Sequence, residues 1–266
     1  MRYCGIHVSA RPALQLLATL HRRRGTGGET ELIASFYAPG DPGAVARTVL
    51  GFGRASAVAV DAPGGRRLDL LAPGRPLRDE LGLPPGRFER HRVAEALLLR
   101  RGLPLHPVAQ GASARATWQA RLAAGFAVHA GLAALEPYRP PAAPGMLEAR
   151  VGIGALGDGR VAEAYPDAVL TALLGHRPSP RRTPWGLQQR IAALRLRGVV
   201  DADGGLWHRT LEELDAVAVA YAAYALAEGL GSWVGDRREG VIVMPVPELA
   251  GSYEPLPPPG RLPLAR

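Results

Sequence analysis

The stretch AVAVDAP, residues 57–63, decides the fold class. A near-continuous run of small apolar residues from 55 to 60 is typical of a strand in the middle of a sheet that is covered on both faces. The run ends in a carboxylate, Asp61, and ligands bind beyond the carboxyl ends of strands in open α/β sheets. We therefore predict an α/β protein whose functional site includes Asp61.

Two other apolar runs carry one carboxylate each. They are VAEAYP (161–166), with Glu163, and LEELDAVAVA (211–220), with Asp215. A buried ionised carboxylate is costly unless an opposite charge or a metal compensates it. We therefore predict that Asp61, Glu163 and Asp215 meet in one site. The alternative for each residue alone is a helix cap or a salt-bridge partner.

Helical spacing distinguishes Asp215 from the acids next to it. Asp215 shares a stripe with Leu211, Ala218 and Ala222, so its side chain should point toward the sheet. Glu212 and Glu213 lie in the first helical turn, where acids complement the helix dipole without a further role. The sequence therefore favours Asp215 as the functional acid.

The remaining pattern predicts one mixed domain over residues 1–248 and a Pro-rich, disordered tail over 249–266. Strands are expected at 3–9, 30–37, 55–60, 146–153, 160–164 and 241–245, and residues 13–20 form a strand or a short helix. Helices are expected at 42–51, 88–101, 112–135, 166–175, 184–198 and 211–229. The strands at 146–153 and 160–164 should form a hairpin, and 241–245 should close the sheet at its edge. A loop rich in Pro, Gly and Arg, 62–87, gives access to Asp61.

Composition limits the partners and the compartment. The chain of 266 residues has a net charge of +8 and a pI near 10.4, which favours nucleic acid as a partner. All 32 basic residues are Arg, however, so part of this charge reflects compositional bias. The clusters at 22–24, 100–101 and 181–182 could contact phosphates or form solvated faces. One cysteine, Cys4, and the lack of an apolar run of about 18–20 residues predict a cytoplasmic protein without membrane contact.

The order of the motifs resembles the family called domain of unknown function 429, a set of predicted nucleases with an RNase H-like fold. The motifs that carry this resemblance are Gly5-Ile6-His7, Asp61-Ala62-Pro63, Arg92-x-x-Glu95-x-x-Leu98 with Arg101-Gly102-Leu103, Glu163-Ala164-Tyr165-Pro166, Leu214-Asp215-Ala216 and Glu239-Gly240-Val241-Ile242-x-x-Pro245. The resemblance covers nearly all of residues 1–248. It implies an RNase H-like mixed sheet covered by helices, with a helical insertion.

The resemblance also implies a catalytic metal site. Asp61, Asp215 and Glu163 would be the catalytic acids and would hold a divalent ion, Mg²⁺ or Mn²⁺. Arg92 would place a phosphate, and Glu95 is a candidate fourth acid. Arg92 and Glu95 are also an i, i+3 pair that could simply bridge each other.

His7 departs from the family pattern. The first strand of RNase H-like nucleases carries an acid that is shared by the catalytic metals, and this chain has an imidazole at that position. A histidine ligand favours Mn²⁺, Zn²⁺ or another transition metal, or a single bound ion. The alternatives are a buried, hydrogen-bonded histidine without a metal, and loss of catalysis.

Three function classes follow from these observations. The leading hypothesis is a metal-dependent nuclease or phosphodiesterase, in which His7, Asp61, Glu163 and Asp215 bind the metal. The second is a catalytically inactive module that binds nucleic acid or protein. An actin-like ATPase or sugar kinase is disfavoured because no Gly-rich phosphate turn follows the first strand.

Overall fold

A computed structural model describes residues 1–25, 28–53, 57–105, 115–141, 145–151, 159–203 and 205–256. The strands are β1 (Arg2–His7), β2 (Gln15–Arg24), β3 (Thr30–Gly40), β4 (Ala57–Val60), β5 (Glu148–Arg150), β6 (Val161–Glu163), β7 (Val199–Asp201), β8 (Ser232–Asp236) and β9 (Gly240–Met244). The helices are α1 (Pro42–Gly51), α2 (Pro76–Glu80), α3 (Val93–Arg100), α4 (Arg115–Gly131), α5 (Pro166–Leu174), α6 (Pro184–Arg195) and α7 (Leu211–Ala227). Short 3₁₀ turns are η1 (Pro12–Leu14), η3 (Ala133–Leu135) and η4 (Leu206–His208).

In the described residues, the strands form one mixed sheet in the order β5-β8-β9-β6-β4-β1-β2-β3-β7. The central strands β1, β4, β6 and β9 are parallel, and β2 runs antiparallel between β1 and β3. Helices α2, α3 and α4 lie between β4 and β6 in the chain, together with β5. The protein is therefore an α/β protein with a mixed sheet, as predicted.

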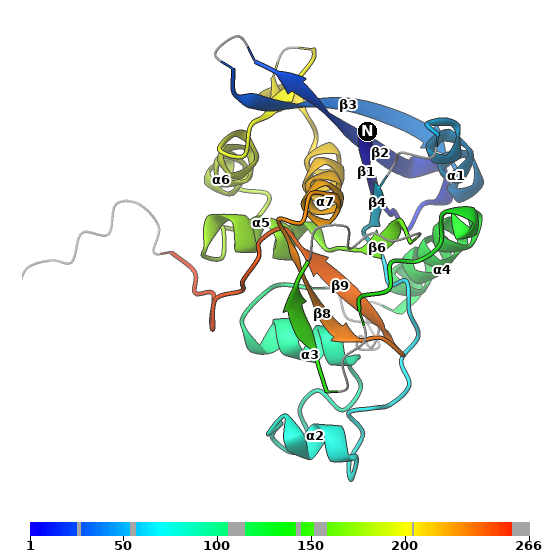
Figure 1. Ribbon diagram of the computed structural model, residues 1–266, viewed down its shortest axis with the longest axis vertical. Coiled ribbons are helices and arrows are strands. Elements are labelled where there is room, and N and C mark those ends of the chain that lie inside the picture. The colour runs from blue at the N-terminus through cyan, green and yellow to red at the C-terminus, as the bar shows by residue number, and fades with distance from the viewer. Residues whose placement is uncertain are drawn as a thin grey trace, which may run out of the picture.

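The two faces of the sheet bury different side chains. Tyr3, Ala57, Ala59 and Ala162 pack in the cluster that contains α7, and α5 and α6 join this side. Cys4, Ile6, Val58, Val60 and Val161 face the opposite cluster, which contains residues of α1 and α4. Figure 1 shows α5, α6 and α7 on one side of the central strands and α1 and α4 on the other. The all-apolar strand β4 is thus covered on both faces.

Local signals at the helix ends agree with the structure. The Asp41 side chain accepts a hydrogen bond from the Ala44 N–H (2.9 Å) ahead of Pro42. Gly175, in the left-handed region at φ 76°, ends α5. Thr210 and Glu213 form a capping box that begins α7, which gives Glu213 a structural role. These contacts lie within a few residues of one another and are therefore readable from sequence.

Several predicted elements are corrected. The hairpin of 146–153 with 160–164 is wrong, because β5 pairs with β8 while β6 pairs with β4 and β9; the predicted turn at 157–159 falls mostly outside the described residues. Strand β9 is internal and not an edge. The helix expected from residue 88 begins only at Val93, and the predicted loop 62–87 contains α2. Strands β7 and β8 are additional elements that the sequence pattern did not reveal.

The chain continues to pack beyond residue 248. Tyr253 is buried, and its N–H donates to the Arg101 carbonyl oxygen (2.8 Å). Arg177 forms a bridge with Pro255. The first part of the predicted tail, through Pro255, therefore packs against the domain. Residues 257–266 lie outside the described part. None of the helices in the described ranges is long and apolar enough to cross a membrane.

Candidate functional site

Three elements bring His7, Asp61 and Asp215 together. His7 is the last residue of β1, and Asp61 directly follows the neighbouring parallel strand β4, where its N–H donates to the Ile6 carbonyl oxygen (2.9 Å). Asp215 lies in α7, above the same strands. The His7 Nδ1 atom is 3.0 Å from Asp61 Oδ2 and 3.9 Å from Asp215 Oδ2. All three side chains are buried, and the predicted convergence of Asp61, Asp215 and His7 is observed.

Two arginines from other elements pair with these aspartates. Arg121 of α4 contacts Asp61 Oδ2 at 2.5 Å, and Arg181, in the loop before α6, contacts Asp215 Oδ2 at 2.6 Å. The arginine side chains are 18% and 32% exposed, whereas the aspartates are almost fully buried. The guanidinium groups therefore close the site on its solvent side.

Neither arginine contact was predicted. Sequence analysis assigned Arg181 to a phosphate or to solvent and did not select Arg121. Both contacts join residues at least 34 positions apart, so no local pattern pointed to them. The requirement that a buried acid have a partner was the one available signal.

One oxygen of each aspartate has no partner. Asp61 Oδ1 and Asp215 Oδ1 are buried and lack a hydrogen bond among the described residues. The pKa of Asp215 is raised to about 7, chiefly by burial; the charges of Arg181 and His7 lower it, and those of Asp61 and Asp167 add smaller increases. The site thus holds Asp215 in a state that readily accepts a proton or a cation.

A small hollow adjoins these groups. Its volume is about 30 Å³, and Asp61, Arg121, Tyr165, Arg181 and Asp215 are among the residues that line it. This volume can hold about one water molecule or a bare ion. A larger ligand would reach the aspartates only after the arginine side chains move outward.

Glu163 lies apart from this cluster. It pairs in register with Val60 and shares the sheet face of Val161, whereas Asp61, one residue after Val60, points to the α7 face. Glu163 lines a different cavity, together with Gly64 and His129. The prediction that all three acids converge is therefore wrong for Glu163, because the period-2 alternation of the strands puts it on the other face.

Arg92 and Glu95 belong with Glu163 in a buried ion cluster. The Arg92 guanidinium donates two hydrogen bonds to the Glu163 carboxylate, with Nη1–Oε2 and Nη2–Oε1 distances of 2.8 and 2.5 Å. Its Nε contacts Glu95 Oε1 at 3.0 Å. Burial disfavours the charge on Arg92, yet Glu163 holds the pKa of Arg92 above its ordinary value. Arg92 is fully buried, so it is not available to a phosphate in this state. Glu95 caps α3 through the Arg92 N–H (3.0 Å).

The Glu-Gly motif at 239–240 also serves this scaffold. Glu239 accepts hydrogen bonds from the backbone N–H groups of Leu68 (2.7 Å) and Val93 (2.8 Å). A Cβ on Gly65 would lie 1.8 Å from the Glu239 carbonyl oxygen. Position 65, in the loop after Asp61, therefore accommodates only glycine. These contacts hold the loop after β4 and the start of α3 in place.

His7, Asp61 and Asp215 offer the side-chain types that bind divalent metals. Two carboxylates and one imidazole suit Mn²⁺ or Zn²⁺, and Asp61 Oδ1 and Asp215 Oδ1 are buried without a hydrogen-bond partner among the described residues. Within the described part of the chain, however, no three His, Cys, Asp or Glu side chains have an arrangement that could hold an ion. The ligand types fit a metal, and the arginine pairs occupy Oδ2 of both aspartates.

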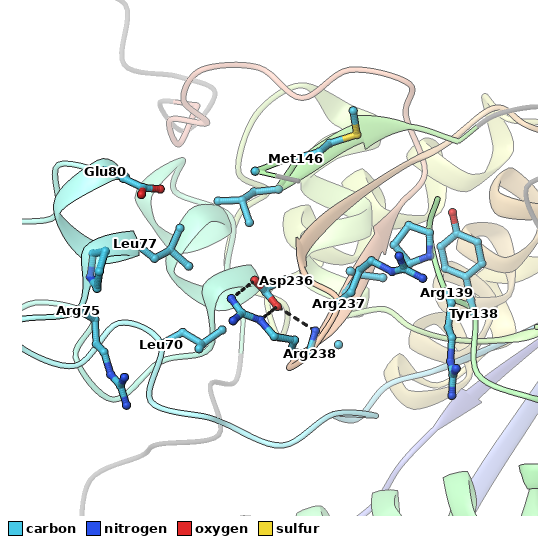
Figure 2. A pocket seen from close by; sticks show the side chains of 16 residues that line it. Leu70, Arg75, Leu77, Glu80, Tyr138, Arg139, Met146, Asp236, Arg237 and Arg238 are labelled. Carbon is cyan, nitrogen blue, oxygen red and sulfur yellow. Dashed lines mark hydrogen bonds and ion pairs between the residues drawn. The ribbon is translucent and has the colours of Figure 1, made fainter. Parts of the chain in front are cut away.

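A larger cavity, of about 890 Å³, lies between α2 and the β8–β9 hairpin (Figure 2). Leu70, Leu77 and Met146 line it, and Arg238 within it is bound to Asp236. It shares no lining residue with the hollow beside Asp61 and Asp215. Its acids do not converge as those at the smaller hollow do, so the candidate functional site is at the smaller hollow.

Comparison with protein families matches residues 42–239 to the family described as "Protein of unknown function (DUF429)". The chain belongs to the DUF429 family. The matched residues include Asp61, Glu163 and Asp215 and begin after His7. Comparison with curated proteins and with solved structures gives no match. Family membership therefore agrees with the motifs and assigns no activity.

Proposed function

We propose that this DUF429 protein is a metal-dependent phosphodiesterase that acts on nucleic acid, with an RNase H-like arrangement of its site. The observation that carries the proposal is the convergence of His7, Asp61 and Asp215 with two buried carboxylate oxygens that have no partner. His7 and the two aspartates would hold a divalent ion only after a rearrangement that moves Arg121 and Arg181 off the carboxylates, because the described side chains are not arranged to hold an ion. When bound, such an ion would activate a water molecule and stabilise charge on the phosphate.

The arginines have a role in the same proposal. Arg121 and Arg181 are partly exposed and neutralise the aspartates in the structure. A cation at the carboxylates would release both guanidinium groups toward solvent, where their planar forks suit phosphate oxygens. Asp61 and Asp215 would then hold the cation while Arg121 and Arg181 orient the phosphodiester. Glu163 and Arg92 support the scaffold in this mechanism and do not take part in the reaction.

A second candidate is an inactive module that binds nucleic acid. The specific observation in its favour is charge balance, because Asp61 and Asp215 are matched by Arg121 and Arg181. His7 also supplies no third carboxylate. As part of either proposal we place the protein in the cytoplasm, since a single cysteine is typical of a reducing compartment.

Cleavage of labelled DNA and RNA in Mn²⁺, Mg²⁺ or EDTA tests the proposal. We expect cleavage only with a divalent ion, and faster with Mn²⁺, because the His7 imidazole suits the softer metal. Asp61→Asn and Asp215→Asn should each abolish it, while Asp79→Asn, an exposed acid in α2, should not. Binding of nucleic acid without cleavage under any divalent ion would select the inactive module.

A further inference from the structure

Trp185 and Trp207 lie on one surface groove although 21 residues separate them in the chain. Trp185 belongs to the first turn of α6 and Trp207 to η4. They are 43% and 50% exposed, whereas Trp118 and Trp233 are buried. The groove has a volume of about 590 Å³, and Ala192 and Leu196 of the α6 region continue its apolar surface. The tertiary structure thus creates an aromatic surface that the scattered tryptophans in the sequence did not indicate.

The charge beside this groove is positive. Arg195 lines it, and Arg182 lies three residues before Trp185 in the chain. Both arginines are exposed, and their guanidinium groups have no hydrogen bond or ion pair with other described residues. Among those residues, no Asp or Glu lines the groove. Charge complementarity therefore favours a polyanion with flat apolar groups over an apolar protein segment.

The groove lies close to the candidate reaction site. Arg181, which pairs with Asp215, precedes Trp185 by four residues, and an extended chain of this length spans at most about 14 Å. Helix α6 lies beside α7, which carries Asp215 (Figure 1). A strand seated on the groove would therefore have a short path to Asp61 and Asp215.

We propose that Trp185 and Trp207 stack the bases of single-stranded nucleic acid, with Arg182 and Arg195 on its phosphates, and that this groove presents the strand to the Asp61–Asp215 site. Unpaired bases expose their faces to aromatic side chains, while duplex bases stack on one another. The proposal rests on the proposed function for the destination of the strand. The binding step itself needs no metal.

Binding of fluorescein-labelled 12-nucleotide single strands, measured by anisotropy in EDTA, tests the groove. Stacking of a base on an aromatic ring is worth roughly 1–3 kcal/mol, so Trp185→Ala and Trp207→Ala should each weaken binding roughly 5- to 150-fold. Trp185→Phe should retain part of the affinity. Phe126→Ala removes an exposed aromatic ring from α4, on the opposite side of the sheet, and should leave binding within twofold. A blunt duplex of the same length should bind more weakly than the single strand.

The outcomes separate this inference from the proposed function. Unchanged single-strand binding in both Trp→Ala variants would overturn it, whatever the nuclease activity. Trp-dependent binding without any metal-dependent cleavage would support the groove and overturn the phosphodiesterase. Concentration-dependent dimers that Trp185→Ala dissolves, without oligonucleotide binding, would identify a protein interface and overturn the inference. Hydrolysis of a small phosphodiester without bases should be equal in parent and variants.

Discussion

Gly5 of β1 lies directly beneath Ala220 of α7, so close that a Cβ on Gly5 would be 2.1 Å from the Ala220 nitrogen and 2.1 Å from the Ala216 carbonyl oxygen. This contact lets the helix that carries Asp215 approach the strand that carries His7. Gly5 of the Gly-Ile-His motif and the small residues of α7 therefore pack directly against each other.

We predict that Gly5→Ala lowers the free energy of unfolding by at least the roughly 1–3 kcal/mol that is typical of overpacking. The added methyl group meets helix backbone, which cannot move alone. Urea denaturation followed by circular dichroism measures the change. Gly51→Ala, where no atom lies within 4 Å of the new Cβ, is the matched control. Equal midpoints for the two variants would refute the close contact.

Glu163→Gln should act on stability. The substitution removes the negative charge that pairs with the buried Arg92 guanidinium. Breaking a buried ion pair lowers the free energy of unfolding by roughly 3–5 kcal/mol. Glu31→Gln breaks the exposed pair with Arg23 and should cost about 1 kcal/mol or less. Thermal denaturation of both variants gives the comparison. If folded Glu163→Gln protein lost all metal-dependent cleavage at a temperature where it stays native, Glu163 would have a direct catalytic role.

Asp215→Asn should stabilise the metal-free protein, and more so at pH 8 than at pH 5. The native pKa of Asp215, about 7, exceeds its ordinary value of 3.8. Between about pH 4 and 7, the carboxyl group is therefore protonated in the native state and ionised in the unfolded chain. Stability contributed by this group therefore falls as pH rises through that window. The penalty at pH 8 is up to about 4 kcal/mol.

Urea titrations of parent and Asp215→Asn protein in EDTA at both pH values measure this difference. Asp79→Asn, at an exposed position, controls for the general effect of losing a carboxylate. A parent protein that is equally stable relative to Asp215→Asn at pH 5 and pH 8 would contradict the raised pKa.

His7→Asp should strengthen Mg²⁺ binding. The substitution places a third carboxylate beside Asp61 and Asp215, and hard Mg²⁺ prefers oxygen ligands. Isothermal titration calorimetry should show at least a tenfold lower Kd, which corresponds to about 1.4 kcal/mol. His208→Asp adds the same charge at an exposed position and should leave the Kd unchanged. Equal affinities for both variants would show that position 7 does not contact the metal.

The sequence by itself determined the elements whose signals are local. Asp41 with Pro42, Thr183 with Pro184 and Gly175 define helix ends through contacts within a few residues. The apolar run of β4 and the helical stripe of Asp215 also indicated which acids face the interior, and the family motifs agreed with them. Asp61 and Asp215 could be selected from the sequence because an acid inside an apolar pattern predicts a buried charge.

Only the tertiary structure decided which of these side chains meet. The register of β6 against β4 put Glu163 on the face opposite Asp61, and a shift of one residue would have reversed this. Arg121 and Arg181 reach the aspartates from elements far away in the chain, and Trp185 and Trp207 line one groove although they too are far apart in the chain. Such contacts depend on strand register and helix packing, which are set by the burial of the whole core and not by neighbouring residues.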